Sequence, residues 1–125
     1  MSDVIHHPAH YTQSRFACEC IDITRHLTFN AGNAFKYVWR HQEKNGVEDL
    51  RKAAVYLRWT IDDERELARA AALPGSYGFV QDLVHEYVTP FAVGPYEALI
   101  DIVNSNFVEA LIRVESAIRA YEDAA

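Results

Sequence analysis

Four polar side chains share one side of a predicted helix in the first third of the chain. At 100° per residue, one sector holds Asn33, Lys36, Tyr37 and Arg40, and the opposite sector is apolar, with Ala34, Phe35, Val38 and Trp39. A lysine and an arginine one turn apart repel each other unless an anion lies between them. Phosphate suits the pair, because a guanidinium binds two oxygens and an ammonium acts as a point charge. The spacing favours a phosphate-binding face, and the alternative is a solvated face beside the core.

The next predicted helix carries a second stripe of this kind. It contains Asp49, Lys52 and Tyr56, with Trp59 close by. Aromatic side chains beside cations suit a nucleobase stacked near its phosphates, although both rings are equally suited to a core or an interface. For Asp49 the sequence leaves three roles open: a ligand of Mg²⁺ that accompanies a phosphate, a neutralising partner of Lys52, or a partner of the helix dipole.

The N-terminal segment concentrates hydrogen-bonding side chains. His7, His10 and Tyr11 surround Pro8, which stiffens the segment and favours an extended start. Two imidazoles and a phenol can donate hydrogen bonds to a base, a ribose or a phosphate. One alternative is an arm packed on a neighbouring subunit. Another is a zinc site formed by the three N-terminal histidines with Cys18 and Cys20, although Cys-x-Cys is not the spacing of a common zinc module.

Apolar periodicity indicates which elements position these residues. It predicts helices over about 16–27, 31–43, 47–73, 79–88, 95–103 and 106–121, although 77–80 and 88–93 are alternatively short strands. We therefore expect an all-α, mainly helical fold: a compact single-domain bundle of about five or six helices over 1–125. The chain divides into an extended N-terminal arm (1–15), a motif-bearing helical half (16–73) and a C-terminal helical half (74–125).

Composition narrows the functional classes. The 125 residues carry a net charge of −6, which disfavours a diffuse electrostatic hold on duplex DNA. No apolar run approaches the roughly 20 residues that span a bilayer, and the N-terminus lacks a secretory pattern, so we expect a cytoplasmic protein with no membrane partner. Phosphate-loop, dinucleotide-binding and nucleophile-elbow motifs are absent. The acidic run 62–66 is expected to be a solvated face of the third helix.

Four stretches in order resemble a small family that is widespread in tailed-phage genomes. They are His7-Pro8-Ala9-His10-Tyr11, Glu19-Cys20-Ile21-Asp22, Gly32-Asn33-Ala34-Phe35-Lys36-Tyr37 with Arg40, and Asp49-Leu50 with Lys52-Ala53 and Tyr56-Leu57. The family is commonly labelled a domain of unknown function, or a nucleotide kinase by similarity to one phage enzyme. That enzyme phosphorylates deoxynucleoside monophosphates without a Walker motif. The resemblance covers roughly residues 6–60.

This resemblance implies a phage or prophage origin, action in the cytoplasm of the bacterial host, and a nucleotide ligand. By matched position it implies catalytic roles for Lys36, Arg40, Asp49 and Lys52, with Mg²⁺ on Asp22 or Asp49 and ATP as phosphate donor. The residues implied to bind substrate are His7, His10, Tyr11, Asn33, Tyr37 and Tyr56. In phosphoryl transfer the cations would neutralise the moving charge.

Other functions compete with the kinase hypothesis. A non-catalytic protein that sequesters a nucleotide signal of host defence would use the same basic and aromatic face. All-helical nucleotide pyrophosphohydrolases hold Mg²⁺ with carboxylates one turn apart, but their E-x-x-E and E-x-x-D signature is missing here. A structural or host-protein-binding factor is a third alternative. Because so short a domain offers little depth for a closed pocket, we expect a homo-oligomer with the site near a subunit boundary.

Overall fold

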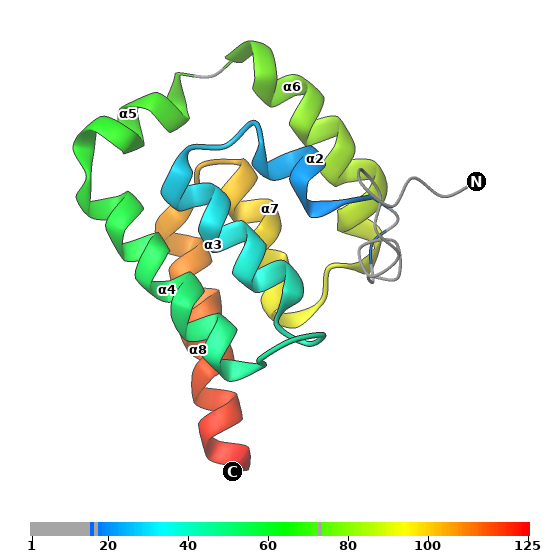
Figure 1. Ribbon diagram of the computed structural model, residues 1–125, viewed down its shortest axis with the longest axis vertical. Coiled ribbons are helices and arrows are strands. Elements are labelled where there is room, and N and C mark those ends of the chain that lie inside the picture. Colours follow the sequence, from blue (N-terminus) through cyan, green and yellow to red (C-terminus); the bar gives the residue numbers. More distant parts are fainter. Residues whose placement is uncertain (1–15, 17, 73) are drawn as a thin grey trace.

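The computed structural model describes residue 16, residues 18–72 and residues 74–125, and this part of the chain is helical without strands (Figure 1). Its α-helices are α2 (Cys20–Thr24), α3 (Phe29–Arg40), α4 (Val47–Asp62), α5 (Glu64–Ala71), α6 (Pro74–Leu83), α7 (Glu97–Val103) and α8 (Phe107–Ala124). A π-helical turn (Val84–Val88) and two 3-10 turns (Thr89–Phe91 and Gly94–Tyr96) connect α6 to α7. The all-α prediction is confirmed. Of the two stretches considered as strands, 77–80 lies within α6, and 88–93 contains the 3-10 turn Thr89–Phe91 followed by two residues without regular structure.

The core forms where the apolar sides of the long helices meet. Helix α4 packs against α3 on one side and α8 on the other, and α7 packs against both α3 and α8. Phe35 and Val38 of α3 and Leu57 of α4 are fully buried, as the helical spacing predicts. One cluster of buried residues extends from Phe16 to Val114, so it joins the two halves of the chain. The C-terminal end of α8 projects beyond this core (Figure 1).

The prediction of one helix over 47–73 is wrong in one respect, because the helix is interrupted at Asp63. That residue is extended (φ −98°, ψ 99°), and its carboxylate accepts hydrogen bonds from the backbone N–H groups of Arg65 (3.0 Å) and Glu66 (3.2 Å). Asp63 therefore ends α4 and caps α5, which is the usual use of aspartate at a helix start. This break raises the number of α-helices in the described residues above the five or six expected.

The acidic run 62–66 is also not a uniformly solvated face. Glu66 is 1 % exposed. Its two oxygens accept hydrogen bonds from the backbone N–H of Asn30 at 2.7 Å and from the side-chain amide of Asn30 at 2.8 Å. This contact joins α5 to the first turn of α3. Helix α3 begins at Phe29, one residue before Asn30, so the carboxylate that accepts hydrogen bonds at the start of this helix belongs to Glu66.

The connections at either end of α3 position its polar side. The helix expected over 16–27 is reduced to α2, and Gly32 lets α3 approach it closely: a Cβ at Gly32 would lie 3.4 Å from the Thr24 carbonyl oxygen. After α3, the chain turns through residues 41–46 and enters α4. Gly46 has φ 58°, a backbone conformation that glycine adopts at no steric cost. The short turn makes α3 and α4 an antiparallel pair.

No helix in the described ranges is both long and apolar enough to cross a membrane.

Candidate functional site

Three cations gather around one aromatic ring where α3 and α4 pack together. The Tyr37 and Tyr56 rings stack with centroids 5.7 Å apart and an interplanar angle of 13°. We call Lys36, Arg40 and Lys52 the cation cluster, because the Lys36 Nζ, Arg40 Cζ and Lys52 Nζ lie 4.5, 5.3 and 5.5 Å from the Tyr37 centroid. Each distance is within the reach of a cation–π contact. The two stripes predicted on separate helices thus form one surface.

Among the described residues, the two lysines of this cluster have no carboxylate partner. Among the residues that the structure describes, the ion pairs involve arginines only, and neither Lys36 nor Lys52 takes part. The aromatic ring offsets part of the repulsion between the cations, because the face of a phenol ring is electronegative. An anion at this point would meet two unneutralised ammonium groups.

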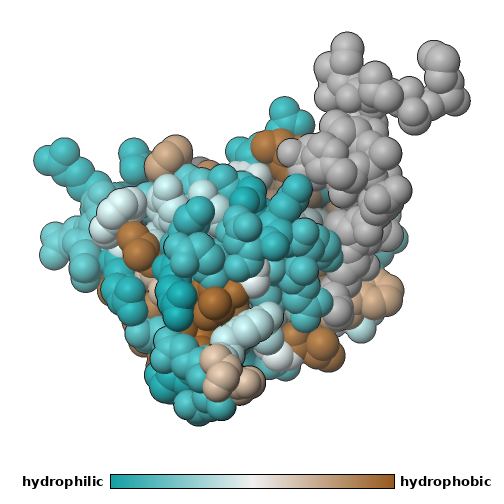
Figure 2. All heavy atoms as spheres, turned by 60° about the horizontal axis from the view of Figure 1, so that its bottom comes forward, coloured by the Kyte–Doolittle hydropathy of each residue, from teal (hydrophilic) through white to brown (hydrophobic). Residues whose placement is uncertain are grey.

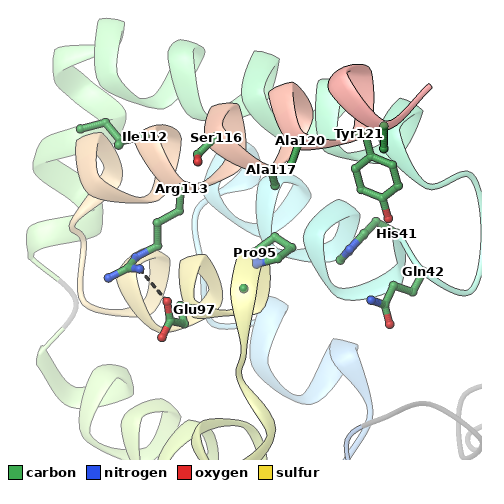
Figure 3. A pocket seen from close by; sticks show the side chains of 12 residues that line it. His41, Gln42, Pro95, Glu97, Ile112, Arg113, Ser116, Ala117, Ala120 and Tyr121 are labelled. Atoms are coloured by element: carbon green, nitrogen blue, oxygen red, sulfur yellow. Dashed lines mark hydrogen bonds and ion pairs between the residues drawn. The ribbon is translucent and has the colours of Figure 1, made fainter.

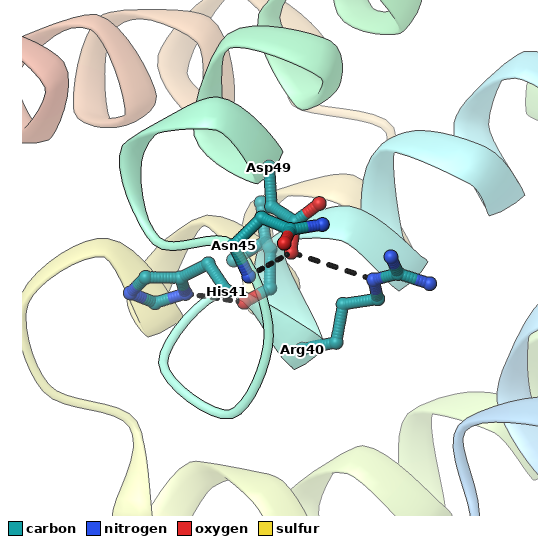
Figure 4. A network of polar contacts seen from close by, with 5 residues as sticks. Arg40, His41, Asn45 and Asp49 are labelled. Carbon is teal, nitrogen blue, oxygen red and sulfur yellow. Dashed lines mark hydrogen bonds and ion pairs between the residues drawn. The ribbon is translucent and has the colours of Figure 1, made fainter.

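Arg40 is the member of the cluster that does have a carboxylate partner. Its Nε lies 3.4 Å from Asp49 Oδ2, an oxygen that also accepts a hydrogen bond from the Asn45 backbone N–H at 3.1 Å (Figure 4). Asp49 is fully buried, and its Oδ1 has no hydrogen-bond partner among the described residues. Of the three roles possible for Asp49, this position in the first turn of α4 fits the partner of the helix dipole, and its cation partner is Arg40 rather than Lys52.

The carboxylates expected to hold Mg²⁺ are on different helices. Asp22 lies in the first turn of α2, where its Oδ2 accepts a hydrogen bond from the Glu19 backbone N–H at 3.2 Å. Asp49 is buried, and its carboxylate contacts Arg40 and the Asn45 backbone N–H. In the described part of the chain, no three His, Cys, Asp or Glu side chains form a metal-binding group. Neither carboxylate belongs to a preassembled ligand group among the described residues, and magnesium binding by Asp22 or Asp49 stays a prediction.

A hollow of about 270 Å³ lies beside Lys36, between α2 and α3. Its lining comprises Thr24, Leu27, Thr28, Phe29, Gly32, Asn33 and Lys36. Asn33 donates a hydrogen bond from its amide to the Phe29 carbonyl oxygen at 2.9 Å. Arg40 is not part of this lining. The cations therefore share a ring and an open surface rather than one enclosed cavity.

The tyrosine pair continues into an exposed row of aromatic side chains. The Tyr56 ring meets Phe29 edge-on at 6.5 Å and Trp59 edge-on at 5.3 Å. Phe29 is 75 % exposed and Trp59 is 54 % exposed. Sequence reasoning missed Phe29, although the signal was present: it lies four residues before Asn33 on the same side of the helix.

Beyond Trp59 this surface becomes acidic. A hollow of about 610 Å³ is lined by Asn30, Trp59, Asp62, Asp63, Glu64 and Arg65. Three of these residues are carboxylates and one is a guanidinium. The surface over α3 and α4 is therefore basic at one end, aromatic in the middle and acidic at the other end.

The remaining site residues expected from the sequence are His7, His10 and Tyr11, and they lie outside the described residues. The two cysteines of the zinc hypothesis are free thiols. Burial, and secondarily the charge of Asp22, raises the pKa of Cys18 to about 11. Burial also raises the pKa of Cys20, which the nearby ammonium of Lys36 lowers only in part. A raised pKa makes the thiolate form, which zinc binds, less favourable in the metal-free protein. The histidines of the zinc alternative lie outside the described residues, so this alternative stays a prediction.

A separate hollow of about 690 Å³ lies between α8 and the turn at Gly94–Tyr96 (Figure 3). Ser116, Ala117 and Ala120 form one wall, and Arg113 at its edge is held by Glu97 at 2.7 Å. Figure 2 is turned so that the C-terminal end of α8 comes forward, and it shows hydrophobic side chains as separate patches in a hydrophilic surface. None of the motif residues lines this hollow, although His41 and Gln42, which follow Arg40, do.

Comparison with known protein families gives a match over part of the chain. Residues 5–58 match a protein family described as a protein of unknown function, DUF3310, and residues 59–125 lie outside this match. The matched range contains all three residues of the cation cluster. No curated protein and no solved structure matches the chain.

Proposed function

We propose, from the cation cluster and from a family match that contains it, that this chain binds a nucleotide through its phosphate groups. The single observation that carries the proposal is that Lys36 and Lys52 converge on one ring without a carboxylate partner among the described residues. Phosphate oxygens supply the missing charge, and the guanidinium of Arg40 still has its terminal nitrogens to offer. The exposed rings of Phe29 and Trp59 supply stacking surface for a base.

The chemistry that follows binding is a narrower proposal. Resemblance to the phage nucleotide kinase supports phosphoryl transfer from ATP to a deoxynucleoside monophosphate. In that reaction the cation cluster would hold the phosphates in line and offset their charge. The carboxylates of Asp22 and Asp49 accept hydrogen bonds from the backbone, and this engagement supports retention of an unchanged nucleotide instead. The same resemblance supports action in the cytoplasm of a phage-infected bacterium.

Calorimetric titration of the full chain tests nucleotide binding. We expect one or more of the deoxynucleoside monophosphates and ATP to bind, and Lys36→Ala to weaken that binding by about ten- to a hundredfold, the worth of one charge-assisted hydrogen bond. Lys44→Ala removes an exposed lysine outside the cluster and should change the affinity little. If no nucleotide binds, or both variants weaken binding equally, the proposal is wrong.

A product assay separates the two narrower proposals. The protein is incubated with ATP, Mg²⁺ and each deoxynucleoside monophosphate, and diphosphates are quantified by chromatography. Formation above a Lys36→Ala control supports transfer. Nucleotide binding with no diphosphate above that control rejects transfer and supports retention.

A further inference from the structure

The basic, aromatic and acidic parts described above form one continuous surface, which we call the association face. Its basic end is the cation cluster, its middle is Phe29, Tyr56 and Trp59, and its acidic end is Asp62, Asp63 and Glu64. The parts are joined by contacts. The three cations contact the Tyr37 ring, and this ring stacks on that of Tyr56. The Tyr56 ring in turn contacts Trp59, which lines the acidic hollow.

The middle of this face exposes apolar area that is costly in water. Phe29 and Trp59 are each more than half exposed, and they adjoin each other through Tyr56. Burial of apolar surface is the main favourable contribution to most protein association. Contiguous aromatic side chains with a charged border are typical of an interaction surface. We therefore expect another protein surface to pack on this aromatic row.

The arrangement of charge identifies the partner surface. Lys52 and Asp62 are ten residues apart on α4, which places them about 15 Å apart along the helix axis. Tyr56 and Trp59 lie on either side of the midpoint between them. A two-fold axis through that midpoint brings the aromatic rows of two copies together. It also brings each basic end onto the acidic end of the other copy.

We propose that two copies of this chain associate antiparallel through the association face. The contact is isologous, so Lys52 of one copy meets Asp62 of the other, and the reverse contact occurs at the opposite end. No other pairing of this face with itself is favourable, because a parallel arrangement would place cations on cations and carboxylates on carboxylates. The proposal does not depend on nucleotide binding.

Charge exchange in the full chain tests this pairing by sedimentation velocity across the micromolar range. Wild-type protein should form a dimer that weakens at high salt, since the Debye length falls from about 10 Å at 0.1 M to about 3 Å at 1 M. Lys52→Glu and Asp62→Lys should each weaken the dimer by about tenfold or more, because each creates two repulsive contacts. The double variant Lys52→Glu with Asp62→Lys should restore the dimer.

Matched controls keep the result interpretable. Arg119→Glu makes the same charge reversal on the exposed side of α8, away from the face, and should leave the dimer intact. Circular dichroism checks that each variant is folded. The double variant should dimerise but bind nucleotide poorly, because it lacks the ammonium group of Lys52. Dimer formation therefore tests the pairing separately from the proposed function. A wild-type monomer at every concentration, or a double variant no better than the singles, overturns the proposal.

Discussion

The carboxylate of Glu66 receives two hydrogen bonds from Asn30 and so places a negative charge at the first turn of α3. The N-terminal N–H groups of a helix have no partner within the helix, and a carboxylate at this end also interacts favourably with the helix dipole. Burial makes the pairing obligatory, because an unpaired N–H away from water is costly. One side chain of α5 therefore fixes where α3, which carries two members of the cation cluster, begins.

Glu66→Ala should lower the free energy of unfolding by about 2–4 kcal/mol, because it removes two hydrogen bonds to a charged group and leaves the Asn30 N–H unpaired. Glu64→Ala, in the same acidic run but exposed, should change it by no more than about 0.5 kcal/mol. Urea denaturation followed by circular dichroism measures both. Equal effects of the two substitutions would show that Glu66 has no special role in the fold.

At the scale of elements, the antiparallel pair α3 and α4 builds the candidate site. The pair depends on a turn whose last residue, Gly46, has φ 58° and ψ −124°. An L side chain is strained in that conformation. The turn also brings the backbone N–H of Asn45 to Asp49, which in turn contacts Arg40. The geometry of the turn and the position of a cluster cation are thus linked.

Gly46→Ala should therefore destabilise the protein by about 1–2 kcal/mol. The matched substitution is Gly78→Ala in α6, where an added Cβ meets nothing within 4 Å. Because glycine in a helix interior is unfavourable, Gly78→Ala should stabilise the protein by about 0.5–1 kcal/mol. Thermal unfolding of both variants measures the difference, and a shift of the same sign in both would contradict the expected strain at Gly46.

Helical spacing predicted the polar and apolar sides of α3 and α4 because those sides follow from local geometry. It did not predict the break at Asp63, since the apolar repeat continues across it and acidic residues are acceptable inside a helix as well as at its start. The burial of Glu66 is a tertiary contact with Asn30, thirty-six positions away, and no local pattern encodes it. For the same reason, two polar stripes on separate helices could not indicate that Tyr37 stacks on Tyr56.

At the scale of the whole molecule, the cations serve two proposed partners. Phosphate and the carboxylates of a second copy are both anions that meet Lys52. A nucleotide at the cation cluster would also occupy part of the aromatic row. A nucleotide that binds the monomer and not the dimer shifts the equilibrium towards the monomer.

Saturating nucleotide should therefore move the protein from dimer towards monomer. The measurement is sedimentation velocity at constant ionic strength, so that screening by the added salt is not mistaken for competition. Inorganic sulfate at matched ionic strength is the control anion for non-specific effects. A dimer that nucleotide strengthens would show that the two partners use the cations together rather than in competition.

The two tryptophans of the chain lie in opposite environments. Trp39 is 6 % exposed and packs between Phe16 and Phe35, with ring centroids 4.4 and 5.7 Å away, whereas Trp59 stands on the surface. Their indole emission consequently carries separate information, since a buried indole emits at shorter wavelength than a hydrated one. The protein thus contains its own pair of optical reporters, one for the integrity of its interior and one for events on its outside.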